Sequence, residues 1–156
     1  MEVIIFVGLQ ASGKSTFYKE RFFDTHVRIN LDMLRTRHRE RLLLQACIEM
    51  KQRFVVDNTN STSAQRAGYI AQAKAAGFAV IGYYFDSTVS ECIARNNKRE
   101  GAARVPVIGI YASAKKLQVP TLAEGFDALY FVRIENGGGF LVGERAEPTA
   151  DPPEVG

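Results

Sequence analysis

The sequence predicts an α/β domain in which helices cover both faces of a mainly parallel sheet. Apolar runs rich in β-branched and aromatic residues alternate with stretches of helical periodicity, a pattern typical of successive strand–helix–strand units. Strands are expected at residues 3–7, 27–29, 54–56, 78–85 and 128–134. Helices are expected at residues 14–23, 32–51, 63–76, 89–98 and 107–117.

Residues suited to helix ends support these boundaries. Asn30 or Leu31 opens the second expected helix, and Thr62 or Ser63 caps the third. Gly77 ends that third helix one residue before a strand. The connections are therefore short, as is usual in compact α/β domains.

Length and composition are those of one ordinary soluble domain. The 156 residues fit a single core, and 46% apolar and 24% charged residues argue against a disordered, fibrous or membrane protein. No apolar run approaches the roughly 18–20 residues that span a bilayer, and the start of the chain lacks the pattern of a secretory leader. We therefore expect a cytoplasmic protein with no membrane partner.

The two cysteines point to no special chemistry. Cys47 and Cys92 each lie inside a stretch of helical periodicity. This placement favours two reduced cysteines packed as small hydrophobic residues over a disulfide framework or a four-ligand metal site.

Charge is divided unevenly along the chain. The formal net charge is +3, but four acidic residues and one arginine from Glu144 onward carry −3, which leaves +6 on residues 1–143. A basic body suits a polyanionic ligand, although many basic proteins bind no nucleic acid. Residues 144–156 combine three prolines with acidic and small residues, so we expect residues 1–143 to form the domain and 144–156 a mobile tail or linker.

A glycine-rich motif directly follows the first expected strand. Residues 8–15 read GLQASGKS, which matches the P-loop pattern G-x-x-x-x-G-K-[ST] and leads straight into an expected helix. The glycines let successive backbone N–H groups face one concave site, and the helix N-terminus adds positive partial charge. The motif therefore predicts a P-loop NTPase fold that binds the phosphates of ATP.

Individual residues of this loop have expected roles. Lys14 should reach the β- and γ-phosphates, and the Ser15 hydroxyl should be a ligand of Mg²⁺. The residues expected to bind the nucleotide are Gly8, Ser12, Gly13, Lys14, Ser15 and Thr16.

A carboxylate and a guanidinium follow the short second strand. A phosphotransferase of this architecture needs a group that accepts the proton of the attacking hydroxyl, near the carboxyl ends of the strands. Asp32 is the best candidate, with Arg35 one helical turn later on the same face, so the two can hold an acceptor hydroxyl and a phosphate. The structural alternatives are a helix N-cap or a first-turn charge for Asp32 and a solvated surface charge for Arg35.

The third strand ends in a second candidate carboxylate. Asp57 follows an apolar run and is placed to hold a magnesium-bound water, as an outer contact of the metal. The alternative is an Asx turn that closes the strand.

A basic segment after the fifth helical stretch is a candidate lid. Arg95, Lys98 and Arg99 precede Gly101, and Arg104 follows. Such a segment can fold over the nucleotide and bring arginine charge to the phosphates, while the alternative is a basic helix end that complements the helix dipole.

Four segments resemble, in the same order, the kinase domain of the polynucleotide 5′-kinase family, which includes bacteriophage, animal-repair and bacterial end-healing enzymes. They are GLQASGKST at 8–16, NLDMLR at 30–35, VVDNTN at 55–60 followed by Gln65 and Arg66, and ARNNKR at 94–99 followed by Val105 and Pro106. A fifth segment, PTLAEGF at 120–126, resembles a late segment of the animal enzyme.

The resemblance implies specific chemistry for these positions. Asp32 would be the general base for a 5′-hydroxyl group, and Arg35 would contact the phosphate between acceptor and donor. Arg95 and Arg99 would clamp the donor phosphates, so the implied catalytic set is Asp32, Lys14, Arg35 and Arg99. The implied fold is the adenylate-kinase-like parallel sheet flanked by helices, with ATP or another NTP as donor, Mg²⁺ as cofactor, and DNA or RNA with a 5′-hydroxyl end as acceptor.

Many members of that family carry further domains. The Asp-x-Asp-x-Thr motif of their 3′-phosphatase domain does not occur in this sequence. The resemblance therefore implies a kinase module alone, either separate or fused to or partnered with other end-healing or ligase modules. Two other functions stay open at this point, a P-loop kinase for a small-molecule hydroxyl group and an ATP-dependent switch.

Overall fold

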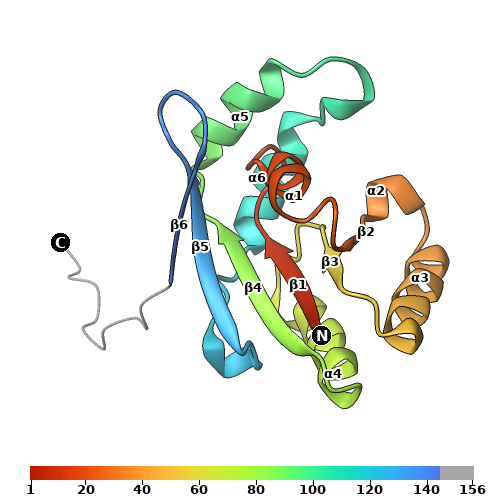
Figure 1. Ribbon diagram of the computed structural model, residues 1–156. Coiled ribbons are helices and arrows are strands. Elements are labelled where there is room, and N and C mark those ends of the chain that lie inside the picture. Colours follow the sequence, from red (N-terminus) through yellow and green to blue (C-terminus); the bar gives the residue numbers. More distant parts are fainter. Residues whose placement is uncertain (145–156) are drawn as a thin grey trace.

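The computed structural model describes residues 1–144, which form one six-stranded sheet with helices packed on both faces (Figure 1). The strand order is β2-β3-β1-β4-β5-β6, in which the first five strands run parallel and β6 is antiparallel to β5. The strands are β1 Glu2–Val7, β2 Val27–Ile29, β3 Phe54–Val56, β4 Ala79–Phe85, β5 Ala128–Ile134 and β6 Phe140–Glu144. The mixed α/β fold class predicted from the sequence is confirmed.

Among the described residues, six α-helices and two short 3₁₀ helices connect the strands. The α-helices are α1 Lys14–Arg21, α2 Leu31–Leu34, α3 Arg37–Met50, α4 Ser63–Ala75, α5 Val89–Asn97 and α6 Val107–Lys116. The 3₁₀ helices are η1 Gly101–Ala103 and η2 Leu122–Glu124. Within residues 1–144, every helix is too short or too polar to cross a membrane.

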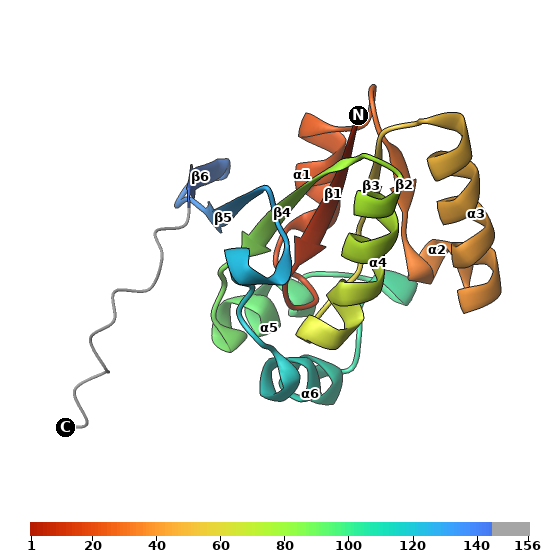
Figure 2. The ribbon, with the colours of Figure 1, turned by 90° about the horizontal axis from the view of Figure 1, so that it is seen from below.

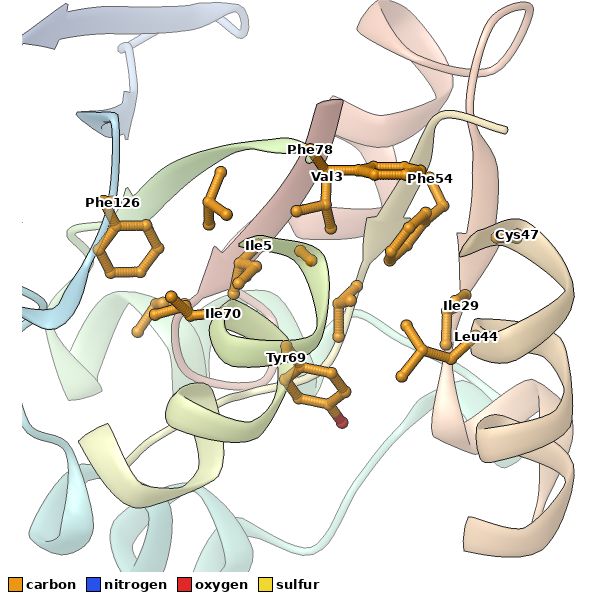
Figure 3. Packing of buried hydrophobic residues seen from close by; sticks show 14 of the residues in the cluster. Val3, Ile5, Ile29, Leu44, Cys47, Phe54, Tyr69, Ile70, Phe78 and Phe126 are labelled. Carbon is orange, nitrogen blue, oxygen red and sulfur yellow. The ribbon is translucent and has the colours of Figure 1, made fainter. Parts of the chain in front are cut away.

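Alternation along β1 divides the core into two layers. Val3 and Ile5 pack with residues of α3 and α4, as the close view of this layer shows (Figure 3). Ile4 and Phe6 face the other way and pack against Phe17 of α1. Because successive side chains of a strand point to opposite faces, a fully apolar β1 requires cover on both sides. The view from below accordingly shows α1 and α4 on opposite sides of β1 (Figure 2).

The path of the chain marks one end of the sheet as the functional end. The connection from β1 leads to β2 on one side, whereas the connection from the neighbouring strand β3 leads across to β4 on the other. In such sheets, ligands bind in the crevice beyond the carboxyl ends of the strands where the connections diverge. Helices α5 and α6, with the segment between them, lie at that end, to which the β1 arrow points (Figure 1).

Two features of the fold differ from the sequence predictions. The helix expected at 32–51 is interrupted, because Arg35 has a φ of 74° and Thr36 caps a new helix by accepting from the backbone N–H of Arg39. Strand β6 was not predicted; it returns antiparallel after a turn with three glycines of positive φ, 137–139.

The boundary of the expected tail also shifts by one residue. Glu144 is the last residue of β6 and pairs with Tyr130 of β5, so it belongs to the sheet. The rest of the expected tail, residues 145–156, lies outside the described residues. Cys47 and Cys92 are free and buried, as predicted.

Candidate active site

The loop between β1 and α1 has the backbone that a phosphate cradle needs. Gly13 caps α1 with a φ of 97°, and a Cβ there would come within 2.9 Å of Ile134 Cδ1. A Cβ at Gly8 would come within 2.9 Å of both Phe85 Cβ and Ser12 Oγ. Both glycines are therefore required by close packing, and Gly13 also by its left-handed backbone.

Lys14 is held by hydrogen bonds to the backbone of the P-loop. Its Nζ donates to the carbonyl oxygens of Gly8 over 2.9 Å and Leu9 over 2.7 Å. Burial lowers the pKa of Lys14 from 10.5 to about 8, an effect that the charge of Asp57 partly offsets. Ser12 Oγ, in the same loop, is buried without a hydrogen-bond partner among the described residues. A lysine with a lowered pKa and an unsatisfied hydroxyl group are both features that a bound phosphate would relieve.

Ser15 and Asp57, the two predicted metal-binding residues, both accept hydrogen bonds from one guanidinium group. Arg28 of β2 donates from Nε to Asp57 Oδ2 over 2.8 Å and from Nη2 to Ser15 Oγ over 2.9 Å. The Asp57 side chain is 2% exposed, so it is a buried carboxylate with a guanidinium partner. A position between two hard oxygen ligands that already accommodates positive charge fits Mg²⁺.

The wider surroundings agree with a metal that arrives with the nucleotide. Residues 1–144 contain no group of three or more His, Cys, Asp or Glu side chains that could hold a metal ion. Mg²⁺ commonly takes one or two protein ligands and completes its shell with waters and substrate phosphates. Ser15 and Asp57 are sufficient for that arrangement.

The acceptor candidates lie just past β2, where Asp32 stands in the first turn of α2 and Arg35 is exposed, so these positions also fit a first-turn charge and a solvated surface charge. The side chain of Asn30, not Asp32, caps α2 by accepting from Met33 N over 2.9 Å. The exposed carboxylate of Asp32 has no hydrogen-bond or ion-pair partner among residues 1–144. Arg35 follows the helix with a φ of 74°, a strained conformation for a non-glycine residue that often marks functional sites. Arg35 is therefore placed by a backbone turn and not, as predicted, by continued helical spacing.

A buried network holds the start of α2 in place. Asn58 Oδ1 accepts from Leu31 N over 2.9 Å, and Asn58 Nδ2 donates to Glu40 Oε2 over 3.1 Å. Glu40 is 4% exposed and also accepts from the Tyr69 hydroxyl over 2.8 Å and from Arg37 over 3.0 Å. The sequence analysis did not identify this network, since its members come from three separate elements.

The predicted lid divides into a fixed part and a part near the phosphates. Arg95 donates to the P-loop carbonyl of Ala11 over 2.6 Å, so it braces the loop from outside the cleft. Buried Asn96 makes two hydrogen bonds with the backbone of Val105, which ties together the two ends of the segment between α5 and α6. Arg99 lines the cleft, and its charge lies close enough to lower the pKa of Lys14.

One cleft of about 1150 Å³ joins these groups at the carboxyl end of the sheet. Of the predicted site residues, those that line it are Lys14, Ser15, Asp32, Arg35, Asp57 and Arg99. Of the others, Gly8, Ser12 and Gly13 shape the P-loop behind it, Thr16 is exposed on α1, and Arg95 supports the loop. Arg28 lines the cleft but was not predicted; the charged position in the middle of a short apolar strand was the signal for it.

Comparisons with known proteins identify the family of the chain. A family model described as an AAA domain matches residues 3–120. The bifunctional polynucleotide phosphatase/kinase of Schizosaccharomyces pombe is 29% identical over 134 residues, which cover 80% of this chain and 32% of that protein. The chain thus spans about a third of the length of that relative.

Solved structures share the fold at low identity. Chaetomium thermophilum Kti12 in complex with ADP-AlF3 has a TM-score of 0.64 and 16% identity, covering 84% of this chain and 88% of that one. A gluconokinase from Sinorhizobium meliloti has a TM-score of 0.60 and 19% identity, covering 85% and 82%. Together with the P-loop at residues 8–15, the family match shows that this chain belongs to the AAA domain family and is a P-loop domain.

Proposed function

We propose that the chain is a polynucleotide kinase domain that transfers the γ-phosphate of ATP to the 5′-hydroxyl end of DNA or RNA. The observation that carries the proposal is that one cleft is lined both by Lys14 and Ser15, suited to a donor nucleotide, and by Asp32 and Arg35, suited to an acceptor. In-line phosphoryl transfer requires donor and acceptor sites to meet in one place.

On the donor side, the P-loop binds the triphosphate. The β- and γ-phosphates accept hydrogen bonds from the backbone N–H groups between Gly8 and Gly13. The Lys14 ammonium group neutralises part of their charge. Ser15 and Asp57 would hold Mg²⁺, which supplies positive charge to the β- and γ-oxygens when it is bound. Arg99, on the lid side of the cleft, adds a further charge where the transferred phosphoryl group becomes more negative.

On the acceptor side, Asp32 takes the proton of the 5′-hydroxyl group while the hydroxyl oxygen bonds to the γ-phosphorus. The bond from that phosphorus to the bridging oxygen of the β-phosphate breaks, and ADP leaves with the electron pair. An exposed carboxylate with no competing partner among the described residues is free to accept this proton. Arg35 positions the acceptor by binding the acceptor phosphate that lies nearest to this arginine.

Charge and relatedness support a nucleic acid as the acceptor. Two carboxylates in the cleft, Asp32 and Asp57, face five cationic side chains, Lys14, Arg28, Arg35, Arg37 and Arg99. This excess of positive charge suits a nucleotide together with a polyanionic acceptor better than a nucleotide with a neutral acceptor. The 29% identical relative from Schizosaccharomyces pombe is named as a polynucleotide phosphatase/kinase, and the P-loop of this chain favours the kinase role of the two.

Transfer of label from γ-labelled ATP tests the proposal. The chain is incubated with Mg²⁺ and either 5′-hydroxyl DNA or 5′-hydroxyl RNA oligonucleotides, and the products are resolved on a denaturing gel. The same oligonucleotides carrying a 5′-phosphate are the matched control, since only the acceptor oxygen differs. We expect label on the 5′-hydroxyl strands alone. Label on sugars or nucleosides but not on oligonucleotides would favour a small-molecule kinase, and ADP release without any acceptor would favour a switch.

A further inference from the structure

The arginine in the middle of β2 lies between the two oxygens assigned to the metal. Arg28 contacts Asp57 Oδ2 at 2.8 Å and Ser15 Oγ at 2.9 Å. Its guanidinium carbon also lies 5.7 Å from the centre of the Tyr18 ring. Contacts to the end of β3 and to α1 thus give this side chain a defined position.

Strand geometry explains why Arg28 reaches this place. Its neighbours Val27 and Ile29 pack into the core layer formed with α3 and α4. Because side chains alternate along a strand, Arg28 projects to the opposite face, where α1 carries Ser15 and Tyr18. The side chain is 26% exposed, at the rim of the cleft.

A guanidinium group and Mg²⁺ compete for the same oxygens, because the metal would bind Ser15 Oγ directly and Asp57 through a metal-bound water. Mg²⁺ binds oxygen ligands at roughly 2.0–2.1 Å and repels a neighbouring cation. Arg28 already uses the Asp57 carboxylate and the Ser15 hydroxyl group as acceptors. The arginine must therefore move away when the metal binds at this position.

We propose that Arg28 is a built-in counter-cation, which neutralises buried Asp57 in the metal-free protein and is displaced by the Mg²⁺ that arrives with the nucleotide. The inference rests on the nucleotide and metal sites of the proposed function and is independent of the acceptor. Arg28 then stabilises the metal-free protein and weakens its apparent affinity for Mg²⁺.

A second arginine–aspartate pair provides a matched control on the other side of the sheet. Arg133 of β5 donates from Nε and Nη2 to Asp86, which directly follows β4. This pair joins a strand arginine to an aspartate at a neighbouring strand end, as Arg28 and Asp57 do. It lies outside the cleft lining, and its side chains are 60% and 39% exposed.

The experiment measures Mg²⁺-dependent binding of a fluorescent, non-hydrolysable ATP analogue, with no acceptor present. If the Arg28 pair forms in about nine-tenths of metal-free molecules, it lowers the apparent Mg²⁺ affinity about tenfold. We therefore expect Arg28→Gln to lower the half-saturating Mg²⁺ concentration about tenfold, Arg28→Lys to lower it less, and Arg133→Gln to leave it unchanged. Thermal unfolding without ligands should show a lower melting temperature for Arg28→Gln than for Arg133→Gln, because only Asp57 is buried.

The outcomes separate this inference from the proposed function. An unchanged or raised Mg²⁺ requirement in Arg28→Gln, or in Arg28→Lys if the glutamine variant does not fold, overturns the role of Arg28 alone. A wild-type chain that binds no analogue at any Mg²⁺ concentration contradicts the nucleotide site itself, and the inference falls with it.

Discussion

Replacing Arg66 by methionine should destabilise the domain strongly, because this arginine is fully buried beneath the active site. Its side chain is 0% exposed. It donates from Nε and Nη2 to the Glu124 carboxylate over 2.8 and 3.1 Å, and from Nη1 to the Asn60 carbonyl oxygen over 2.8 Å. Methionine fills similar space but leaves a carboxylate and a carbonyl group without their donors.

The expected loss follows from that geometry. Removing one partner of a buried ion pair typically costs about 3–5 kcal/mol, since the remaining charge stays away from water. Glu124 is 16% exposed and retains some solvent, so we expect the lower end of that range, about 3 kcal/mol. Total stabilities of domains are about 5–15 kcal/mol, so the loss is a large fraction of the whole.

Arg66 also links η2 to the P-loop. Asn60, whose carbonyl group it holds, donates from Nδ2 to Phe6 O over 2.7 Å, and the preceding Thr59 O accepts from Gly8 N over 3.0 Å. Nucleotide affinity should therefore fall together with stability in Arg66→Met.

Urea unfolding of the two variants Arg66→Met and Arg133→Met makes the comparison. The exposed pair of Arg133 should contribute little to the unfolding free energy, because solvent screens it. A loss below about 1 kcal/mol in Arg66→Met, or equal losses in both variants, would refute the reasoning from burial.

Three further predictions concern cations of the P-loop and the lid. Lys14, with a pKa of about 8 before the nucleotide binds, must be charged to bind phosphate, so nucleotide affinity should be level below pH 7 and fall by up to about tenfold per unit above pH 8. Titration calorimetry in two buffers of different ionisation enthalpy should show proton uptake near pH 8, and constant affinity up to pH 9.5 would contradict the lowered pKa. Arg99→Ala should reduce turnover by about 10³-fold or more if its charge stabilises the transferred phosphoryl group. Arg95→Ala should act through a loosened P-loop and raise the KM for ATP. If Arg95→Ala and Arg99→Ala both show the same transfer kinetics as Arg133→Ala, the lid has no part in the mechanism.

The parts of the fold that the sequence predicted are those coded by local pattern. The strands at the centre of the sheet are apolar on both faces, and the P-loop has a fixed spacing between strand and helix, so both are visible in short windows. The expected bounds 27–29, 54–56 and 128–134 coincide with β2, β3 and β5. Lys14, Ser15, Asp32 and Asp57 meet in one cleft because each follows the carboxyl end of a parallel strand.

The parts that were missed depend on backbone strain or on contacts between distant segments. Helical periodicity continues through Arg35, and nothing in that pattern signals the positive φ that ends α2 there. Strand β6 is short and glycine-containing, and it exists because β5 offers it a free edge. Two sets of hydrogen bonds join residues from different elements and required the three-dimensional structure. They are those of Arg28 with Ser15 and Asp57, and that of Glu40 with Asn58.

Asp32→Asn provides the most direct test that this cleft transfers phosphate to a 5′-hydroxyl end. Asparagine keeps the shape of the side chain but cannot accept the proton, so turnover on a 5′-hydroxyl oligonucleotide at saturating ATP should fall by roughly 10²- to 10⁴-fold. Nucleotide affinity and unfolding free energy should change by less than about 0.5 kcal/mol, because Asn30 caps α2 and Asp32 is exposed. Asp24→Asn, at an exposed aspartate outside the cleft lining, should leave turnover unchanged. Wild-type turnover in Asp32→Asn would contradict the proposed mechanism and place the acceptor site elsewhere.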